Sequence, residues 1–280
     1  MTTSWTVFLD IDGTLLAEWQ TVTEPVRQAL IEARQRGHQI YICTGRTQVE
    51  LAHLMADVEY DGVVGAGGCY LQIGDDLVWQ HCFAAPALAQ LIERLEEDQA
   101  PFYFQVRDAL VPSPRLLPAL ERRIEAHLAA DGSAAMRTEL DHYLSWFTEP
   151  STTARDDIYK VAFLGGHGRD RSGLADRYGD LADVLDAIVP LLGPGSGELL
   201  QPGLSKASGM TRLFEHQGID PAHTIAIGDS GNDLEMLQTA GIGIAMGNAT
   251  PRLLAVADEV TDRVEDDGVV TALRRHGLID

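Results

Sequence analysis

Residues 5–14 read Trp-Thr-Val-Phe-Leu-Asp-Ile-Asp-Gly-Thr, an apolar run that ends in two aspartates, Asp10 and Asp12. The run 7–9 predicts a buried strand, and extended backbone points side chains two residues apart to the same face. Neighbouring carboxylates raise each other's pKa unless a cation lies between them. A divalent metal would remove this conflict, and Gly13 lets the backbone turn towards a ligand. The alternative interpretation is a plain Asp-Gly turn.

Length and composition describe a globular protein with an unusual charge. The chain has 280 residues, of which 45% are hydrophobic and 22% charged, enough for one large domain or two modest ones. Its net charge is −21 and its pI is about 4.6. Such a surface repels nucleic acid and anionic lipid, so we expect neither as a partner.

Cysteine and histidine usage argues against disulfides and zinc. The three cysteines, Cys43, Cys69 and Cys82, have no C-x-x-C spacing, and the nine histidines form no H-x-H or H-E-x-x-H pattern. The chain shows no signal peptide and no apolar run of the ~18 residues that a membrane span needs. We expect a cytoplasmic protein with reduced thiols.

Short apolar runs that alternate with helical patterns predict an α/β fold, a Rossmann-like parallel sheet built from βαβ units. The expected strands are residues 7–9, 39–43, 62–65, 224–227 and 242–245. The expected helices are residues 24–36, 47–55, 208–217, 232–239 and 251–257. Thr23, Pro25 and Gly37 suit the cap, first turn and end of the first helix.

The middle of the chain has a different pattern, typical of a compact α+β module. We expect helices at 86–98, 116–130 and 181–188, and strands at 102–106, 143–147 and 158–164. Breaks near 82–86 and in the glycine-rich stretch 193–197 predict the boundaries. The expected organisation is a discontinuous core, 1–83 and 199–280, with residues 84–198 inserted as a separate module.

Three polar motifs follow strands of the predicted core. They are the Asp10/Asp12 pair, Thr44-Gly45-Arg46 after residues 39–43, and Gly-Asp-Ser-Gly-Asn-Asp at 228–233 after residues 224–227. Ligands of open α/β sheets bind at the carboxyl ends of the strands, so these motifs are expected to converge. Taken singly, the second is a plain strand-to-helix turn and the third a loop that ends in a helix cap.

Lys206 is one of only two lysines in the chain, the other being Lys160. It stands at the start of a predicted helix, where a cation opposes the helix dipole by about 0.3–1 kcal/mol. A bound anion would reverse that penalty. The alternative is a solvated surface lysine.

These motifs together resemble the haloacid dehalogenase superfamily, whose signatures are D-x-D-G-T, a Ser or Thr after the second strand, a Lys, and G-D-x-x-N-D. The loop Gly-Asp-Ser-Gly-Asn-Asp-Leu-Glu-Met-Leu and the later Ile-Ala-Met-Gly-Asn-Ala are similar to the Cof-type branch (subfamily IIB). That branch carries a C2-type cap between Thr44 and Lys206, where the inserted module falls. One departure is Gly67-Gly68-Cys69, where many members have Asn-Gly-Ala, and it bears on substrate choice.

The resemblance implies the hydrolysis of a phosphomonoester through an aspartyl-phosphate. Asp10 is implied as the nucleophile, Asp12 as the general acid and base, and Lys206 as the group that neutralises charge on both nucleophile and phosphate. It implies phosphoryl-oxygen ligands at Thr44, the Gly45 amide, Arg46, Lys206 and Asn232. It implies Mg²⁺ held by the Asp10 carboxylate, the Asp12 carbonyl, Asp229 and Asp233, the last either directly or through another ligand.

The expected substrate is a small phosphorylated metabolite, either a sugar phosphate or a phosphorylated cofactor, and the oligomeric state is open. A phosphomutase or phosphotransferase shares the same intermediate and is the main alternative. A non-enzymatic phosphometabolite-binding protein is a second, although a pure binder needs no general acid. Serine hydrolase chemistry, suggested by Gly228-Asp229-Ser230-Gly231, is disfavoured because Asn232 stands where a nucleophile elbow has Gly.

Overall fold

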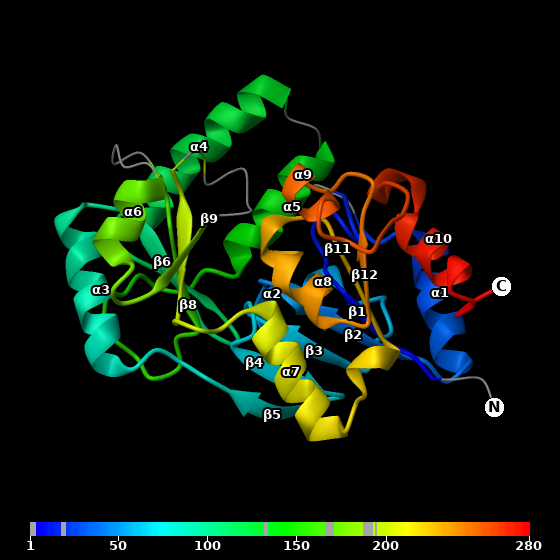
Figure 1. The fold of residues 1–280 in the computed structure, drawn as a ribbon. Helices are drawn as coiled ribbons and strands as arrows, with labels where there is room; N and C mark the ends of the chain where they lie inside the picture. The colour runs from blue at the N-terminus through cyan, green and yellow to red at the C-terminus, as the bar shows by residue number, and fades with distance from the viewer. Residues whose placement is uncertain (1–3, 18–20, 132–133, 166–170, 187–192, 194) are drawn as a thin grey trace. The chain divides into compact units, whose positions relative to one another are not determined.

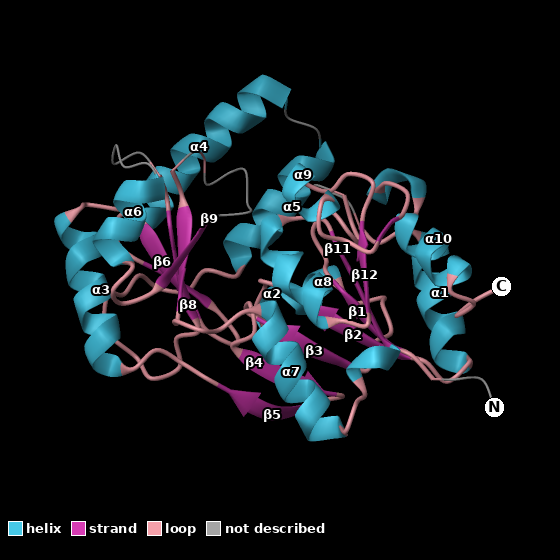
Figure 2. Cartoon of the chain, viewed as in Figure 1, coloured by secondary structure: helices cyan, strands magenta, loops and turns pink. Residues whose placement is uncertain are grey.

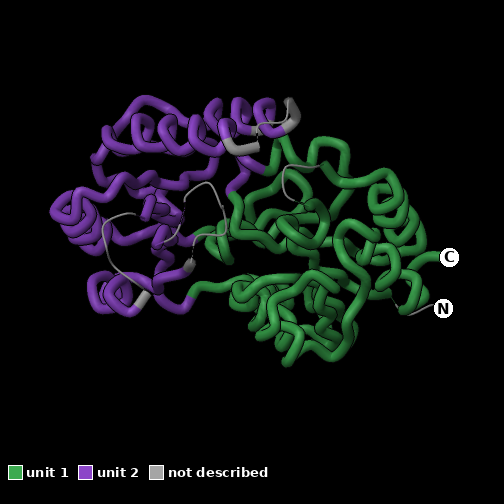
Figure 3. The backbone as a smooth tube through the Cα atoms, turned by 90° about the horizontal axis from the view of Figure 1, so that it is seen from above, with its two compact units in different colours: residues 1–46, 51–80, 204–280 green, residues 47–50, 81–203 purple. Residues whose placement is uncertain are grey.

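The computed structural model describes residues 4–17, 21–131, 134–165, 171–186, 193 and 195–280. The chain divides into two compact units (Figure 3). Unit 1 comprises residues 1–46, 51–80 and 204–280, and unit 2 comprises residues 47–50 and 81–203. The changeovers near 80 and 203 lie a few residues from those expected at 83 and 199. The short stretch 47–50 joins unit 2 through its own hydrogen bonds, such as that from the Val49 N–H to the Arg107 carbonyl.

Unit 1 is built on an eight-stranded sheet with the order β13-β12-β11-β1-β2-β3-β4-β5 (Figures 1 and 2). The six strands from β13 to β3 run parallel, and β4 and β5 add an antiparallel edge. The strands are β1 (Thr6–Leu9), β2 (Gln39–Cys43), β3 (Gly62–Gly65), β4 (Tyr70–Ile73), β5 (Asp76–Gln80), β11 (Thr224–Gly228), β12 (Ile242–Ala245) and β13 (Glu259–Val260). The predicted parallel α/β core is confirmed.

Helices cover both faces of this sheet in the way that a doubly wound fold requires. Helices α7 (Lys206–Gln217) and α8 (Leu234–Thr239) pack against Phe8 and Tyr41, while α1 (Glu24–Gln35) and α10 (Gly268–Arg275) pack together on the other side of β1 (Figure 1). Unit 1 also contains α9 (Pro251–Leu254) and the short 3₁₀ turns Pro221–His223, Gly231–Asp233 and Val264–Asp266, while α2 (Gln48–Leu54) begins in unit 2 and ends in unit 1.

Local sequence explains where the two long helices of this unit begin and end. Thr23 caps α1 by accepting from the Val26 N–H, as expected, and Gly37 follows the helix with a positive φ. Ser205 caps α7 in a reciprocal pair with Ser208, and Gly218 ends the helix in the left-handed conformation. The Ser205 cap fixes the residue that follows it, Lys206, in the first turn of α7.

Unit 2 contains a five-stranded antiparallel sheet with the order β7-β6-β8-β10-β9. The strands are β6 (Phe102–Gln105), β7 (Leu110–Pro112), β8 (Lys160–Phe163), β9 (Asp183–Asp186) and β10 (Gly197–Leu200). The helices are α3 (Ala85–Glu97), α4 (Leu116–Asp131), α5 (Ala134–Ser145) and α6 (Arg171–Tyr178). The core lies between one sheet face, with Phe102 and Phe104, and the apolar stripe of α3 and α6.

Two elements of the sequence prediction are wrong in this unit. Residues 143–147, expected as a strand, contain the last turn of α5, where Leu140 and Tyr143 lie three residues apart and are both buried. Residues 183–186, expected within a helix, form β9 because they pair with β10, and residues 187–188 lie outside the described residues. In both cases long-range packing outweighs a local signal that was ambiguous over so short a stretch.

Within the described part of the chain, none of the helices combines the length and the apolar character that crossing a lipid bilayer requires.

Lys160 is buried in unit 2, with 1% of its side chain exposed. Its ammonium donates to the Glu198 carboxylate on the neighbouring strand at 2.7 Å. A buried charge that loses its partner is costly, whereas a matched apolar pair is often tolerated in its place. Lys160 and Glu198 therefore form a structural ion pair within the sheet of unit 2.

We expect Glu198→Ala to lower the free energy of unfolding by about 3–5 kcal/mol, because it leaves the Lys160 ammonium buried without its carboxylate. The double variant Lys160→Met/Glu198→Leu should recover most of this loss. Urea unfolding of the whole protein measures both. Equal destabilisation in the single and double variants would contradict the ion-pair account.

Candidate active site

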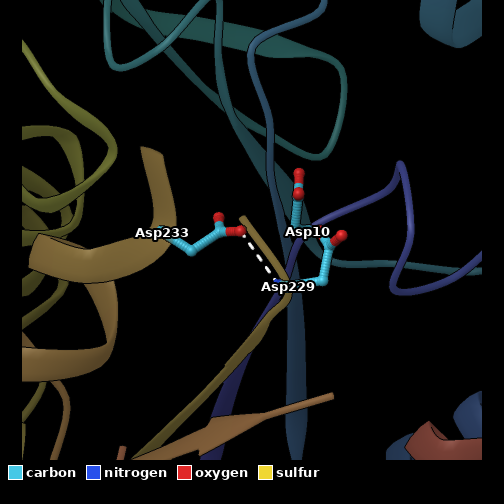
Figure 4. Close-up of side chains that lie close together, drawn as sticks. All are labelled: Asp10, Asp229 and Asp233. Atoms are coloured by element: carbon cyan, nitrogen blue, oxygen red, sulfur yellow. Dashed lines mark hydrogen bonds between the residues drawn. The ribbon is translucent and has the colours of Figure 1, made fainter. Parts of the chain in front are cut away.

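The three motifs meet at one edge of the unit 1 sheet. Strands β2 and β11 flank β1 on either side, with Leu9 opposite Ile42 and Ile227. The residues that follow these strands therefore stand side by side, as the parallel arrangement dictates. Asp10, Asp229 and Asp233 each place a carboxylate oxygen within 4.8 Å of the others (Figure 4). It is the only such group of His, Cys, Asp or Glu side chains among the described residues.

Lys206 lies inside this cluster. Its ammonium contacts the Asp10 Oδ1 at 2.7 Å and the Asp233 Oδ1 at 2.6 Å. Only 2% of the Lys206 side chain is exposed, and the two carboxylates are at most 4% exposed. Lys206 is thus a buried cation of the site and not a surface lysine.

Both carboxylate oxygens of Asp233 accept hydrogen bonds from groups of the protein. Oδ1 accepts from Lys206, and Oδ2 accepts from the Ser230 N–H at 2.9 Å. Oδ2 also accepts from the Asp229 N–H at 3.0 Å, the bond that Figure 4 draws. The carboxylate therefore fixes the Gly228–Ser230 turn and the Lys206 ammonium together.

Asp12 is held by Arg46 in a two-bond ion pair. The Arg46 Nε donates to one Asp12 oxygen at 2.8 Å and the terminal nitrogen to the other at 2.7 Å. Burial by itself raises the pKa of Asp12, but the guanidinium outweighs it and the pKa is lowered from its usual value. The structure thus brings Arg46, expected to meet phosphate, into contact with the expected proton donor.

Two other expected phosphate ligands, Thr44 and Asn232, belong to the loops that follow β2 and β11. Thr44 is fully buried at the end of β2, and its hydroxyl accepts from the Arg46 N–H across Gly45 at 3.1 Å. Asn232 is half-buried, and its side-chain oxygen accepts from the Ser230 hydroxyl. Each of these side chains bonds within its own loop.

The electrostatics of the cluster favour the binding of a further cation. Burial and the charge of Asp233 raise the pKa of Asp10 despite the Lys206 ammonium. Burial, together with Asp233, raises the pKa of Asp229 to about 7. Burial lowers the pKa of Lys206, but the two carboxylates outweigh it and raise it above its usual value. One ammonium does not balance the three carboxylates.

The donor set fits a hard divalent cation. Asp229 Oδ1 is buried without a hydrogen-bond partner, although buried acceptors are normally satisfied. Three clustered carboxylates supply the oxygen ligands that Mg²⁺ prefers. The residues present could therefore bind a metal, with Asp10 and Asp229 having oxygen atoms to offer.

Asn248 supports this site but was not among the residues predicted from the sequence. Its side-chain amide donates to the Gly13 carbonyl at 2.8 Å, in the turn that follows Asp12. The signal was the Gly-Asn pair after a predicted strand, but nothing in the sequence says that it reaches a turn 235 residues earlier.

Comparison with known proteins agrees with this geometry. The model of the haloacid dehalogenase-like hydrolase family matches residues 7–273. The chain is 24% identical to a putative phosphatase, YkrA of Bacillus subtilis, over 98% of both chains. It is 27% identical to the pyridoxal phosphate phosphatase YbhA of Escherichia coli, over 98% of this chain and 99% of that one. It also matches longer proteins, of which it spans 46% and 54%.

A solved structure shares the fold. BT1666 of Bacteroides thetaiotaomicron, described among phosphatases of the haloalkanoate superfamily, aligns with a TM-score of 0.78 and 25% identity, over 99% of this chain and 96% of that one. The buried Asp-Lys-Asp cluster, the order of its motifs and the family match over nearly the whole chain lead to one assignment. The chain belongs to the haloacid dehalogenase-like hydrolase family, as a Cof-type phosphatase.

Proposed function

We propose that the protein is a Mg²⁺-dependent phosphomonoesterase that works through an aspartyl-phosphate on Asp10. The observation that carries the proposal is the Lys206 ammonium at 2.7 Å from the Asp10 carboxylate, within a cluster that also contains Asp229. Attack on a phosphate dianion needs a nucleophile and nearby positive charge, which Lys206 supplies and which a metal held by Asp229 would increase.

Charge is the main obstacle to this attack. A carboxylate 4 Å from a phosphate dianion meets a repulsion of roughly 8 kcal/mol at an effective dielectric constant of 20. Lys206 lies against the nucleophile and offsets part of that repulsion before the substrate arrives. Bound Mg²⁺ would supply the remaining positive charge, held by the carboxylates of Asp10 and Asp229 and the carbonyl of Asp12, with Asp233 behind them.

The bonds change in two steps. In the first, an Asp10 oxygen forms a bond to phosphorus while the ester P–O bond breaks, and Asp12 donates a proton to the departing oxygen. In the second, Asp12 takes a proton from water, whose oxygen attacks phosphorus and releases Asp10 and inorganic phosphate. Asp12 thus gives up one proton in the first step and takes one from water in the second.

We assign the phosphoryl oxygens to four groups near the nucleophile: Thr44, the Gly45 amide, Asn232 and Lys206. Arg46 also contacts the phosphate in this proposal, and its guanidinium already binds one anionic group, the Asp12 carboxylate. Bidentate guanidinium pairs suit phosphate as well as carboxylate.

We assign substrate choice to residues 84–198 as an inserted cap. The proposed substrate is a small phosphorylated metabolite, a sugar phosphate or a phosphorylated cofactor, and the relative YbhA is a pyridoxal phosphate phosphatase.

Release of inorganic phosphate from a panel of phosphorylated sugars, vitamins and phosphoglycerate derivatives tests the proposal and ranks the classes of substrate. Transfer of the phosphate to a second sugar instead of water would favour the phosphomutase alternative. Tight binding without phosphate release would favour a sensor.

We expect Asp10→Asn to lower kcat by about 10³-fold or more, because an amide oxygen does not form a stable phosphoryl ester. The protein should stay folded by circular dichroism. Asp57→Asn, at an exposed aspartate of the same unit, is the matched control and should keep full activity. Phosphate release close to that of the unchanged protein would remove Asp10 from the nucleophile's role.

Activity should fall to background after chelation with EDTA and return on addition of Mg²⁺, since the carboxylate cluster otherwise repels the substrate. Asp229→Asn should raise the Mg²⁺ concentration for half-maximal activity by about tenfold or more. Both are measured as initial rates of phosphate release at fixed substrate. Full activity in metal-free protein would rule out the metal scheme.

A further inference from the structure

The loop 246–250, after strand β12, binds the backbone of both aspartate-bearing loops of the site. Asn248 Nδ2 donates to the Gly13 carbonyl at 2.8 Å, in the turn that contains Asp12. The Thr250 N–H donates to the Asp229 carbonyl at 2.9 Å. One short loop therefore sets the spacing between two loops that come from opposite ends of the chain.

The orientation of the Asn248 amide follows from its partners. Its Oδ1 accepts from the Val264 N–H at 2.9 Å, and its Nδ2 donates to a carbonyl. Because a backbone N–H only donates and a carbonyl only accepts, the reverse orientation would lose both bonds. Val264 thus anchors the amide, and the amide holds Gly13.

Gly13 lies directly against the Asp229 carboxylate. Its φ is +79°, and a Cβ atom there would lie 2.2 Å from the Asp229 Oδ2. The turn lies so close to Asp229 that a residue with a Cβ atom would not fit at this position. A shift of this turn would change the distance between Asp229 and the backbone of Asp12.

We propose that Asn248 is a positioning residue that holds the Asp12-Gly13 turn against Asp229 and so sets the spacing of the oxygen ligands for the divalent cation. This inference rests on the proposed function, which places the metal on these loops. Asn248 itself touches neither metal nor substrate in this proposal. Groups behind a metal's ligands commonly change metal affinity by about 10–100-fold when they are removed.

Two variants separate this positioning effect from charge. Asn248→Ala removes the bond to the Gly13 carbonyl. Asn248→Asp keeps the acceptor for the Val264 N–H, but sets a carboxylate oxygen against the Gly13 carbonyl. A negative charge near the site would by itself tighten Mg²⁺ binding, whereas loss of the turn's position weakens it. We expect the dissociation constant of Mg²⁺ to rise about tenfold or more in both variants.

The measurement is titration calorimetry of Mg²⁺ into the whole, substrate-free protein, with thermal unfolding to establish folding. Thr261→Val is the matched control. It removes a buried side-chain bond to the Gly268 carbonyl in the same C-terminal region, and it should bind Mg²⁺ like the unchanged protein. If Asn248→Ala does not fold, the dissociation constant of Mg²⁺ in Asn248→Asp tests the inference.

The outcomes distinguish this inference from the proposed function. If the unchanged protein binds Mg²⁺ and Asp229→Asn loses it, but either folded Asn248 variant binds within twofold of the unchanged protein or more tightly, the inference is wrong and the metal site stands. Equal weakening in Thr261→Val also overturns it, because the effect is then one of general stability. If the unchanged protein binds no Mg²⁺, the proposed metal site fails and the inference with it.

Discussion

The site depends on one interaction, the buried Lys206 ammonium between the carboxylates of Asp10 and Asp233. The buried carboxylates of Asp10 and Asp233 repel each other, and burial strengthens that repulsion. The lysine offsets it and joins three segments that are distant in sequence. Because Asp233 also binds the backbone after β11, the same ammonium that steadies Asp10 steadies the loop carrying Asp229.

Parallel strands make this arrangement possible. The first turn of α7 supplies the ammonium, while β1 and β11, which are hydrogen-bonded neighbours, deliver the carboxylates to one edge. At that edge the turn after Asp12 approaches Asp229 so closely that only Gly13 fits. The chain is strongly acidic overall, and an acidic surface repels anions. An anionic substrate therefore depends on local positive charge, which Lys206 and Arg46 supply.

Arg46 binds two anions in the proposed mechanism, the Asp12 carboxylate and the phosphoryl group. The guanidinium holds the Asp12 carboxylate in a two-bond pair, with about a quarter of each side chain exposed. In the proposed reaction Arg46 also meets the phosphoryl group, so proton donor and substrate share one cation. Lys160, the second lysine, is instead committed to Glu198 inside unit 2. Both lysines of the chain are therefore buried in ion pairs, Lys206 in the candidate site and Lys160 in the sheet of unit 2.

The parallel core and the motifs that end its strands could be predicted from the sequence, because hydrophobic periodicity and each motif, such as those around Asp10 and Asp229, can be recognised within a short stretch of the chain. It failed at residues 143–147 and 183–186, where partners distant in sequence decided between helix and strand. Three features of the site became visible only in the folded chain: Lys206 is buried, Arg46 binds Asp12, and Asn248 binds the Gly13 carbonyl. These contacts depend on how loops from both ends of the chain pack, and no local pattern encodes that geometry.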